Sequence, residues 1–199
     1  MRVALCVPSG DLVHADFCLS FADLIVTSVL NGIETVLLNS RTSLITNSRY
    51  TLVKEALRRE ADKLLFVDSD MMFPDDALRC LLTHEKAIVG ATYIRRREPH
   101  TILGYGLDDV QPGATGLVPF ARLPAGMLLV DAKVFARVPE PYFNSEWRPE
   151  TRDFISEDYW FCDAARAAGF EVWCDLDLSH QMGHVGTLVY TWALAPASS

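Results

Sequence analysis

The sequence has no long apolar stretch. None of the hydrophobic runs among its 199 residues approaches the ~20 residues that a membrane-spanning helix needs. The first run, residues 3–8, is too short for the core of a signal peptide, and Gly10-Asp11 follow it closely. We therefore expect no membrane span and a cytoplasmic location.

The sequence also lacks a cysteine pattern of the kind that makes disulfides or zinc sites. Its five cysteines are odd in number and widely spaced, and no CxxC or Cys/His zinc pattern is present. They are Cys6, Cys18, Cys80, Cys162 and Cys174. Each lies in an apolar or helical context, so we expect buried free thiols, which fit a reducing compartment.

Positive charge is scarce. The chain has 18 Lys and Arg against 26 Asp and Glu, which gives a formal net charge of -8. This balance argues against sequence-independent binding to a nucleic-acid backbone, which needs a basic face. A nucleotide can still bind if a metal ion screens its phosphates. Glycine-rich dinucleotide and P-loop motifs are absent, and so is the GxSxG motif of serine hydrolases.

Half of the residues are hydrophobic, and the length suits one domain with a sizeable core. Strand-like apolar runs alternate with helical patterns in the first half of the chain. We expect strands at 3–7, 34–38, 64–67 and 87–93, and helices at about 15–30, 43–61 and 75–84. This alternation predicts an α/β fold with a mostly parallel central sheet flanked by helices.

The second half has a different character. Residues 95–124 are rich in Gly and Pro, which predicts an irregular hairpin region or a mobile loop with β-like pieces at 101–103 and 116–120. Further on we expect a strand at 127–130, helices at 131–138 and 155–168, a strand at 171–175 and regular structure at 188–194. We expect one compact domain, 1–199, in which 1–94 form a nucleotide-binding half and 95–199 an acceptor and catalytic half; both halves can share one sheet.

The stretch KLLFVDSDMMFP organises the chain. Its four apolar residues predict a strand buried on both faces, and Asp68-Ser69-Asp70 follow at the carboxyl end, where open α/β sheets bind ligands. Carboxylates two residues apart in extended chain lie on one side, roughly 7 Å apart, and repel unless a cation lies beside them. This predicts a divalent-metal site holding a diphosphate. The alternative is a solvated turn whose aspartate caps a helix.

Two acids, Glu157 and Asp158, follow Ser156 at the start of a predicted helix. A serine N-cap with acids in the first turn stabilises a helix without any further function. The alternative is that Asp158 or Glu157 is a general base held in a cleft.

Two histidines, His180 and His184, lie four residues apart, but the glycines around them argue against a helix. Imidazole is a common ligand of first-row divalent metals. One of the two can therefore complete a carboxylate–imidazole site with Asp68 and Asp70. The alternative is a hydrogen-bonded loop histidine.

Four other features are candidates for ligand contacts. The loop Pro8-Ser9-Gly10-Asp11 follows the first strand, where nucleotides bind in α/β sheets. Arg49 either reaches a nucleotide or lies on the surface. The run Arg95-Arg96-Arg97 is either a solvated loop or neutralises a phosphate or an anionic acceptor. Gly126 allows a ligand to approach the backbone closely.

Taken together, these segments resemble the nucleotide-sugar-dependent glycosyltransferases of the GT-A fold, and family 2 in particular. The matching segments occur in the order PSGD, TNSR, LLFVDSDMMFP with its DxD motif, IVGATY, AGMLLVDAKVF, SEDYWFCDAARAAGFEVWCD and GHVG. The resemblance covers most of the chain, except roughly 97–119 and the last ten residues. It implies an enzyme that transfers a sugar from a nucleotide-sugar donor to an acceptor hydroxyl.

The resemblance also implies roles for individual residues. Asp70 would bind the metal, Mn²⁺ or Mg²⁺, and Asp68 would contact the ribose or the metal. His184 would be the later metal ligand, with His180 as the second choice. Asp158 resembles the catalytic base of inverting members. The metal would stabilise the leaving diphosphate, and UDP is the expected nucleotide by base rate.

The acceptor is a glycan, a protein or a small molecule. The chain is short for this class, so the acceptor-binding part is small or another chain of an oligomer supplies it. Three rival functions remain. A phosphohydrolase of the haloacid-dehalogenase type also uses Asp-x-Asp, but its motif usually lies nearest the amino terminus. A nucleotidyltransferase usually carries a glycine-rich basic loop, and a degenerate nucleotide-binding module would keep the fold without catalysis.

Overall fold

Apolar runs of the first half form three neighbouring parallel strands, as their composition predicts. In the computed structural model, which describes residues 1–111, 113–186 and 189–191, β1 (Arg2–Ser9) pairs with both β2 (Glu34–Arg41) and β3 (Lys63–Val67). The middle residues of β1 and all but the first residue of β3 are buried. The prediction that β3 is covered on both faces is confirmed.

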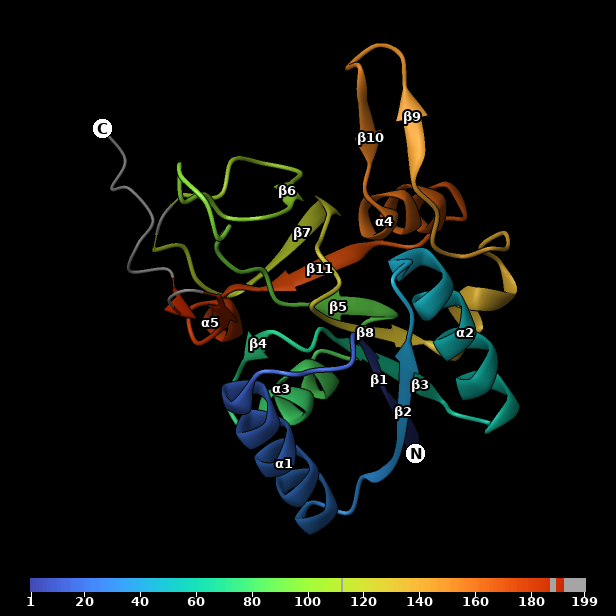
Figure 1. Ribbon diagram of the computed structural model, residues 1–199, viewed down its shortest axis with the longest axis vertical. Helices are drawn as coiled ribbons and strands as arrows, with labels where there is room; N and C mark the ends of the chain where they lie inside the picture. Colours follow the sequence, from blue (N-terminus) through green and yellow to red (C-terminus); the bar gives the residue numbers. More distant parts are fainter. Residues whose placement is uncertain (112, 187–188, 192–199) are drawn as a thin grey trace.

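Helices cover the sheet on two sides, and alternate strand residues face different helices (Figure 1). The four main helices are α1 (Ala15–Leu30), α2 (Ile45–Arg58), α3 (Ala77–Thr83) and α4 (Glu157–Ala167). Leu65 packs in the cluster formed with α1 and α3, and its neighbours Leu64 and Phe66 pack in the cluster formed with α2 and α4. This two-residue alternation is the pleat of a strand.

The central sheet has eight strands in the order β2-β1-β3-β8-β5-β11-β7-β6. The strands of the second half are β5 (Ile88–Gly90), β6 (Tyr105–Gly106), β7 (Leu117–Arg122), β8 (Met127–Asp131) and β11 (Val172–Asp175). β8 lies antiparallel between β3 and β5, and β7 lies antiparallel to β11. The sheet is otherwise mostly parallel, and both halves of the chain contribute to it.

A small second sheet connects the segment after β3 to the end of the described chain. β4 (Met71–Met72) pairs with β12 (Gly183–Val185), which pairs with β13 (Val189–Tyr190). Strand–helix alternation gave no sign of β4 or β12. The expected regular stretch at 188–194 is described only at 189–191, where it includes β13; the rest lies outside the described residues.

Other elements depart from expectation in detail. The predicted strand 87–93 ends at Gly90, and the predicted helix at 131–138 is a short 3-10 helix, η1 (Ala132–Ala136). A hairpin of β9 (Glu146–Arg148) and β10 (Asp153–Ile155) projects from the molecule before α4 (Figure 1). A short helix, α5 (Leu176–Ser179), follows β11. Within the described ranges, no helix has the length and hydropathy of a membrane span.

All five cysteines are free, as expected, but the prediction that all are buried is wrong for Cys18. Cys18 is exposed because it lies on the outer face of α1, and Cys80 is half-buried. The structure also gives a different reason from the one expected for a glycine at position 126. A Cβ atom there would lie 2.4 Å from the Tyr93 hydroxyl oxygen, so the close approach is to a protein side chain.

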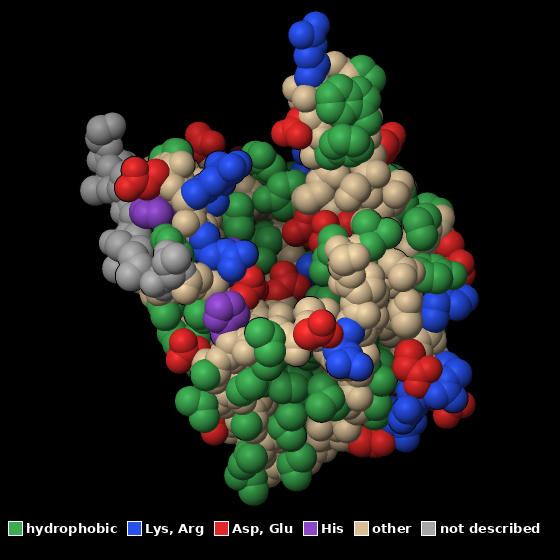
Figure 2. Space-filling model, viewed as in Figure 1, with side chains coloured by type: hydrophobic (Ala, Val, Ile, Leu, Met, Phe, Trp, Pro, Cys, Tyr) green, Lys and Arg blue, Asp and Glu red, His purple; other side chains and the backbone are tan. Residues whose placement is uncertain are grey.

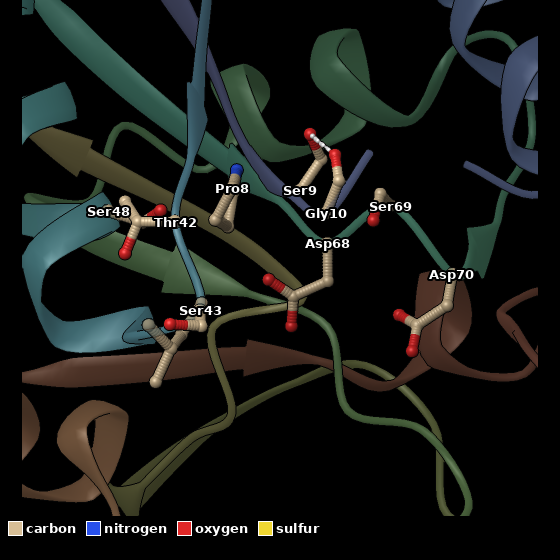
Figure 3. A pocket seen from close by; sticks show the side chains of 10 residues that line it. Pro8, Ser9, Gly10, Thr42, Ser43, Ser48, Asp68, Ser69 and Asp70 are labelled. Carbon is tan, nitrogen blue, oxygen red and sulfur yellow. Dashed lines mark hydrogen bonds between the residues drawn. The ribbon is translucent and has the colours of Figure 1, made fainter. Parts of the chain in front are cut away.

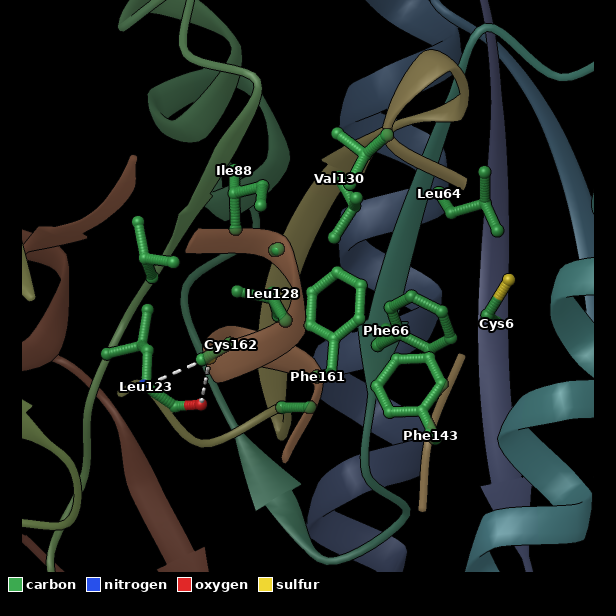
Figure 4. Close-up of a cluster of buried hydrophobic side chains, with 14 of the residues drawn as sticks. Cys6, Leu64, Phe66, Ile88, Leu123, Leu128, Val130, Phe143, Phe161 and Cys162 are labelled. Carbon is green, nitrogen blue, oxygen red and sulfur yellow. Dashed lines mark hydrogen bonds between the residues drawn. The ribbon is translucent and has the colours of Figure 1, made fainter. Parts of the chain in front are cut away.

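Phe66 is the centre of an aromatic group in the cluster on the α2 and α4 side (Figure 4). Its ring is fully buried and contacts the rings of Phe135 and Phe143 edge-on, with centroids 6.5 and 5.1 Å away. Phe161 stacks on Phe143 at 4.8 Å. The group ties β3 to α4, which carries the second pair of acids.

We predict that Phe66→Ala lowers the free energy of unfolding by about 3–5 kcal/mol, because it opens a cavity in this group. Leu30→Ala is the control, since Leu30 is 80% exposed at the end of α1 and its loss should cost less than about 0.5 kcal/mol. Urea unfolding of both variants measures the difference. Similar losses in the two variants would contradict the assignment of this core.

Candidate active site at the carboxyl end of β3

The end of β3 turns sharply and places two carboxylates at the edge of the sheet. The Asp68 amide donates to the Gly126 carbonyl at 3.2 Å, and the Met71 amide donates to the Asp68 carbonyl at 3.1 Å. The Asp70 carbonyl accepts from the Val185 amide at 2.7 Å. The side chains of Asp68 and Asp70 point to the same side of the chain (Figure 3).

Arg49 of α2 lies buried behind this turn, with 2% of its side chain exposed. Its Nη2 atom lies 2.9 Å from Asp68 Oδ1, and its Nε atom lies 3.0 Å from Glu157 Oε1. Its Nη1 atom donates to the Ala125 carbonyl at 3.2 Å. The interpretation of Arg49 as a surface residue is therefore wrong: its guanidinium joins the first aspartate of the motif to the start of α4.

Burial and charge have opposite effects on the pKa values in this group. Burial raises the pKa of Asp68 and of Glu157, and the positive charge of Arg49 partly offsets that rise. Burial lowers the pKa of Arg49, but the charges of Asp68 and Glu157 raise it more, so its net pKa lies above the usual range. Arg49 therefore stays charged, and the carboxylates beside it compensate a cation that water does not reach.

Asp70 contacts different side chains from those around Asp68. Its Oδ2 atom lies 2.9 Å from Arg96 Nη1 and 3.6 Å from His184 Nε2. Burial raises the pKa of Asp70, but His184 and Arg96 lower it more, so its net pKa lies below the usual range. The pairing of His184 with Met71 across β12 and β4 explains why this histidine reaches Asp70.

The chemistry of Asp70 and His184 fits a divalent cation. The Nδ1 atom of His184 lies 3.0 Å from the Ile94 carbonyl oxygen, and an N–H donated there leaves the Nε2 lone pair directed to Asp70. A carboxylate suits both Mn²⁺ and Mg²⁺, and an imidazole beside it favours Mn²⁺ of the two, in a site that takes its other ligands from phosphates and water. No cluster of three or more His, Cys, Asp or Glu suited to a metal is present in the described part of the chain, so two protein ligands are what the geometry offers.

The second histidine lies elsewhere. His180 follows α5, and its Nε2 atom lies 2.8 Å from the Ala114 carbonyl oxygen. His184 Nε2, by comparison, lies 3.6 Å from Asp70 Oδ2 in the DxD segment. His184 is therefore the stronger candidate for a metal ligand.

A cavity of about 290 Å³ opens beside the two aspartates (Figure 3). Five of the residues expected to contact a nucleotide line it, namely Pro8, Ser9, Asp68, Ser69 and Asp70. Asp11 instead lines a neighbouring cavity of about 270 Å³, which it shares with Ser9. Sequence reasoning missed Thr42 and Ser43, which also line the first cavity. They follow β2, whose carboxyl end meets those of β1 and β3 at one edge, and that position was the available signal.

The two acids at the start of α4 have different surroundings. Glu157 is buried and bound to Arg49. Asp158 Oδ1 accepts the Ser156 hydroxyl and, at 2.8 Å, the Tyr159 amide, while Oδ2 has a single longer contact, 3.4 Å from the Ala125 amide. Ser156 occupies the N-cap position, but its side chain makes no bond to the helix backbone. Asp158 thus keeps one carboxylate oxygen for another partner.

A larger cavity, of about 920 Å³, has Ser156 and Tyr159 in its wall, on either side of Asp158 in the sequence. Figure 2 shows a hollow on this face with carboxylates at its centre and Lys or Arg side chains beside it. Asp158 contacts Ala125, Ala125 contacts Arg49, and Arg49 contacts Asp68, which lines the first cavity. This chain of hydrogen bonds links Asp158 to a residue in the wall of the first cavity.

Comparisons with known proteins show likeness in structure and not in sequence. No family model matches the chain, and no curated protein matches it. The solved structure of A197 from STIV is similar over 94% of this chain and 86% of that chain, with a TM-score of 0.63 and 18% identity. A mutant Drosophila beta-1,4-galactosyltransferase 7, in complex with manganese, UDP-Gal and xylobiose, is similar over 93% of this chain and 71% of that chain, with a TM-score of 0.57 and 16% identity.

At these identities the likeness establishes the fold. The chain has a GT-A-like α/β fold, with a mostly parallel central sheet flanked by helices in a single compact domain. The expected fold class is confirmed. The roles of individual side chains stay predictions.

We predict that Arg49→Met lowers the free energy of unfolding by about 3–5 kcal/mol, because it leaves two carboxylates buried without their cation. Arg59→Met is the matched control at the end of α2, where Arg59 is 51% exposed and pairs with Glu55 at 2.8 Å. Its loss should cost less than about 1 kcal/mol.

Chemical denaturation of both variants measures the difference. Adding Asp68→Asn and Glu157→Gln to Arg49→Met should recover part of the loss, because the remaining groups are then neutral. The account of Arg49 fails if Arg49→Met is no more destabilising than Arg59→Met.

Proposed function

We propose that this chain is a metal-dependent glycosyltransferase, which transfers a sugar from a nucleoside-diphosphate sugar to an acceptor hydroxyl. The observation that carries the proposal is the arrangement of acids beside two cavities. Asp70 lines the smaller cavity and its Oδ2 atom lies 3.6 Å from His184 Nε2, whereas Ser156 and Tyr159, which flank Asp158 in the sequence and bind its Oδ1 atom, line the larger one. The fold shared with a UDP-sugar transferase supports the same reading and favours UDP.

The smaller cavity is the proposed donor site. Pro8, Ser9 and Ser69 would contact the nucleotide, together with the carboxylates of Asp68 and Asp70. A diphosphate beside two carboxylates is repelled unless a cation lies between them. Asp70 and His184 would hold that cation, Mn²⁺ or Mg²⁺, which when bound stabilises the negative charge of the leaving diphosphate.

Asp158 is the proposed general base. Two donors fix its Oδ1 atom, so the direction of the carboxylate is set by the Ser156 hydroxyl and the Tyr159 amide. Its Oδ2 atom would accept the proton of the acceptor hydroxyl as that oxygen attacks the sugar carbon. Attack from the side opposite the leaving diphosphate would invert the configuration at this carbon.

Glu157 has a different proposed role. Its Oε1 atom is bound to Arg49 in a buried position, so it is poorly placed to exchange protons with an acceptor. We assign it to the positioning of Arg49 and of the first turn of α4. Of the two neighbouring acids, Glu157 therefore has a structural role in this proposal and Asp158 a chemical one.

A metal-independent donor site is the second candidate function, because Arg96 already contacts Asp70 at 2.9 Å. In that case the guanidinium supplies the positive charge that a diphosphate needs. This would be a nucleotide-binding module or a transferase that does not use a metal. Chelation distinguishes the two candidates.

We predict that UDP binds in the presence of Mn²⁺ and that a chelator or Asp70→Ala weakens binding at least about tenfold, because either change removes the metal that offsets the charge of the diphosphate. Asp23→Ala, which removes an exposed acid from α1, should bind like the wild type. Titration calorimetry of UDP measures all four conditions. Tight binding of UDP that neither the chelator nor Asp70→Ala weakens would exclude the metal and favour Arg96 as the source of positive charge.

We predict that Asp158→Asn leaves UDP binding within about twofold of the wild type but lowers the transfer rate by about 10²–10⁴-fold, since an amide cannot take the proton. Glu157→Gln should instead act mainly on folding: it should lower the free energy of unfolding, and the folded enzyme should keep most of its transfer rate. Release of UDP in the presence of an acceptor gives the rate. Near-wild-type turnover by Asp158→Asn would remove Asp158 from the mechanism.

A further inference from the structure

The larger cavity is unusually basic for an acidic chain. Four arginines line it, namely Arg95, Arg97, Arg122 and Arg148, against the two acids Glu150 and Asp153. Both acids are exposed, and they lie next to or within the β9–β10 hairpin. The charged residues that line the cavity thus have a formal net charge of +2, in a chain whose formal net charge is -8.

The backbone explains how the arginine run reaches this cavity. Ile94 forms an antiparallel bridge with Ile102, and the Arg95 amide donates to the Thr101 carbonyl at 2.9 Å. The chain then bends at residues 96–99. Arg95 and Arg97 line the larger cavity, whereas Arg96 contacts Asp70 and the Val185 carbonyl. The run is divided between two sites.

The four arginines differ in how many ion pairs and hydrogen bonds their guanidinium groups already make within the protein. Arg122 forms a two-point ion pair with Asp163, at 2.9 and 2.7 Å, and Arg148 contacts Glu146 at 3.2 Å. The Nε atom of Arg148 is nevertheless buried without a hydrogen-bond partner among the described residues. The guanidinium groups of Arg95 and Arg97 make no ion pair or hydrogen bond within the described ranges. Arg95, Arg97 and Arg148 therefore have N–H groups with which they can bind a ligand.

Aromatic rings line the same cavity. Tyr105 and Phe154 are 59% and 63% exposed, which is high for side chains of this size. Tyr105 packs edge-on against Tyr159 at 5.5 Å, and the Tyr159 hydroxyl oxygen accepts the Gly104 amide at 2.7 Å. These contacts hold Tyr105 in place and leave part of its surface open. A flat apolar surface beside hydrogen-bonding groups suits the C–H face of a sugar ring.

We infer that this cavity binds the acceptor and that the acceptor is a saccharide carrying a negative charge, a carboxylate or a phosphate. Arg95 and Arg97 bind the charged group, because a guanidinium group can donate two parallel hydrogen bonds to two oxygens of either anion. Tyr105 and Phe154 support the sugar ring, and the hydroxyl to be modified lies toward Asp158. The inference rests on the transferase function proposed above and adds the chemical class of its acceptor.

The volume and the charge of the cavity favour this class over others. A cavity of about 920 Å³ is at the upper end for small-ligand sites and has room for more than one sugar ring. A neutral acceptor would leave two arginines without partners in a partly enclosed site. A nucleic-acid backbone needs a broad basic face, which a chain with a net charge of -8 lacks.

Direct binding of saccharides, without donor, tests the inference. Titration calorimetry compares cellobiouronic acid with cellobiose, and glucose 6-phosphate with glucose, so that the carboxylate and phosphate sources are measured separately. We expect at least one anionic probe to bind about tenfold or more tightly than its neutral counterpart in the wild type. Added salt should reduce this preference, because partly exposed ion pairs are screened.

Three variants complete the experiment. Arg95→Gln with Arg97→Gln should lose the preference, Arg95→Lys with Arg97→Lys should keep part of it, and the control Arg166→Gln, an exposed arginine on α4, should keep all of it. Circular dichroism checks that each variant is folded. Equal binding of charged and neutral probes by the wild type, or a preference that survives in the glutamine variant, would overturn the inference.

The result is separable from the proposed function. UDP binding with Mn²⁺ in the same protein, but without any preference for anionic saccharides, overturns the inference and leaves the transferase proposal standing. A preference for anionic saccharides that depends on Arg95 and Arg97, in a protein that does not bind UDP, supports the acidic-saccharide site and overturns the transferase proposal.

Discussion

The buried guanidinium of Arg49 is the interaction on which the arrangement of the site depends. It binds Asp68 at the end of β3, Glu157 at the start of α4 and the Ala125 carbonyl before β8, and these three segments are far apart in the sequence. The rings of Phe66 and Phe143 lie 6.0 and 5.7 Å from it, so the charge is surrounded by apolar groups. A buried cation tolerates few alternative positions for its partners, because each unmade bond leaves an uncompensated charge. The two acidic segments are therefore held together by electrostatics and by packing.

Because of this constraint, the two pairs of acids, Asp68 with Asp70 and Glu157 with Asp158, are arranged in the same way. In each pair one acid binds Arg49, and these are Asp68 and Glu157. The other acid of each pair has no contact with Arg49 among the described residues: Asp70 contacts Arg96 and His184, and Asp158 contacts Ser156, Tyr159 and Ala125. In the proposed function Asp70 would serve a cation and Asp158 a proton. The proposed transfer reaction requires both, since a leaving diphosphate gains charge while an acceptor hydroxyl loses a proton.

Much of the fold follows from local sequence, and most of the site does not. The strand before Asp68 and the helices around it were predictable because periodicity and length are local signals. The antiparallel insertion of β8 was not, since the run from Met127 carries no sign of its direction. The burial of Arg49 was also hidden, because a charged residue in an amphipathic helix usually faces water. His184 could not be separated from His180 by sequence, since its pairing with β4 is a contact across more than 100 residues. The division of Arg95 to Arg97 between two sites likewise depends on a bridge that sequence alone does not reveal.

The most direct test of the account is a crystal structure of the protein with Mn²⁺ and UDP, using anomalous scattering to locate the metal. The account predicts one strong manganese peak within bonding distance of the Asp70 carboxylate and His184 Nε2, with the diphosphate in the cavity at the carboxyl ends of β1, β2 and β3. Arg49 should keep its bonds to Asp68 and Glu157. A manganese peak away from Asp70 and His184, or a nucleotide bound outside this cavity, would contradict the central claim that the carboxyl end of β3 is the donor site.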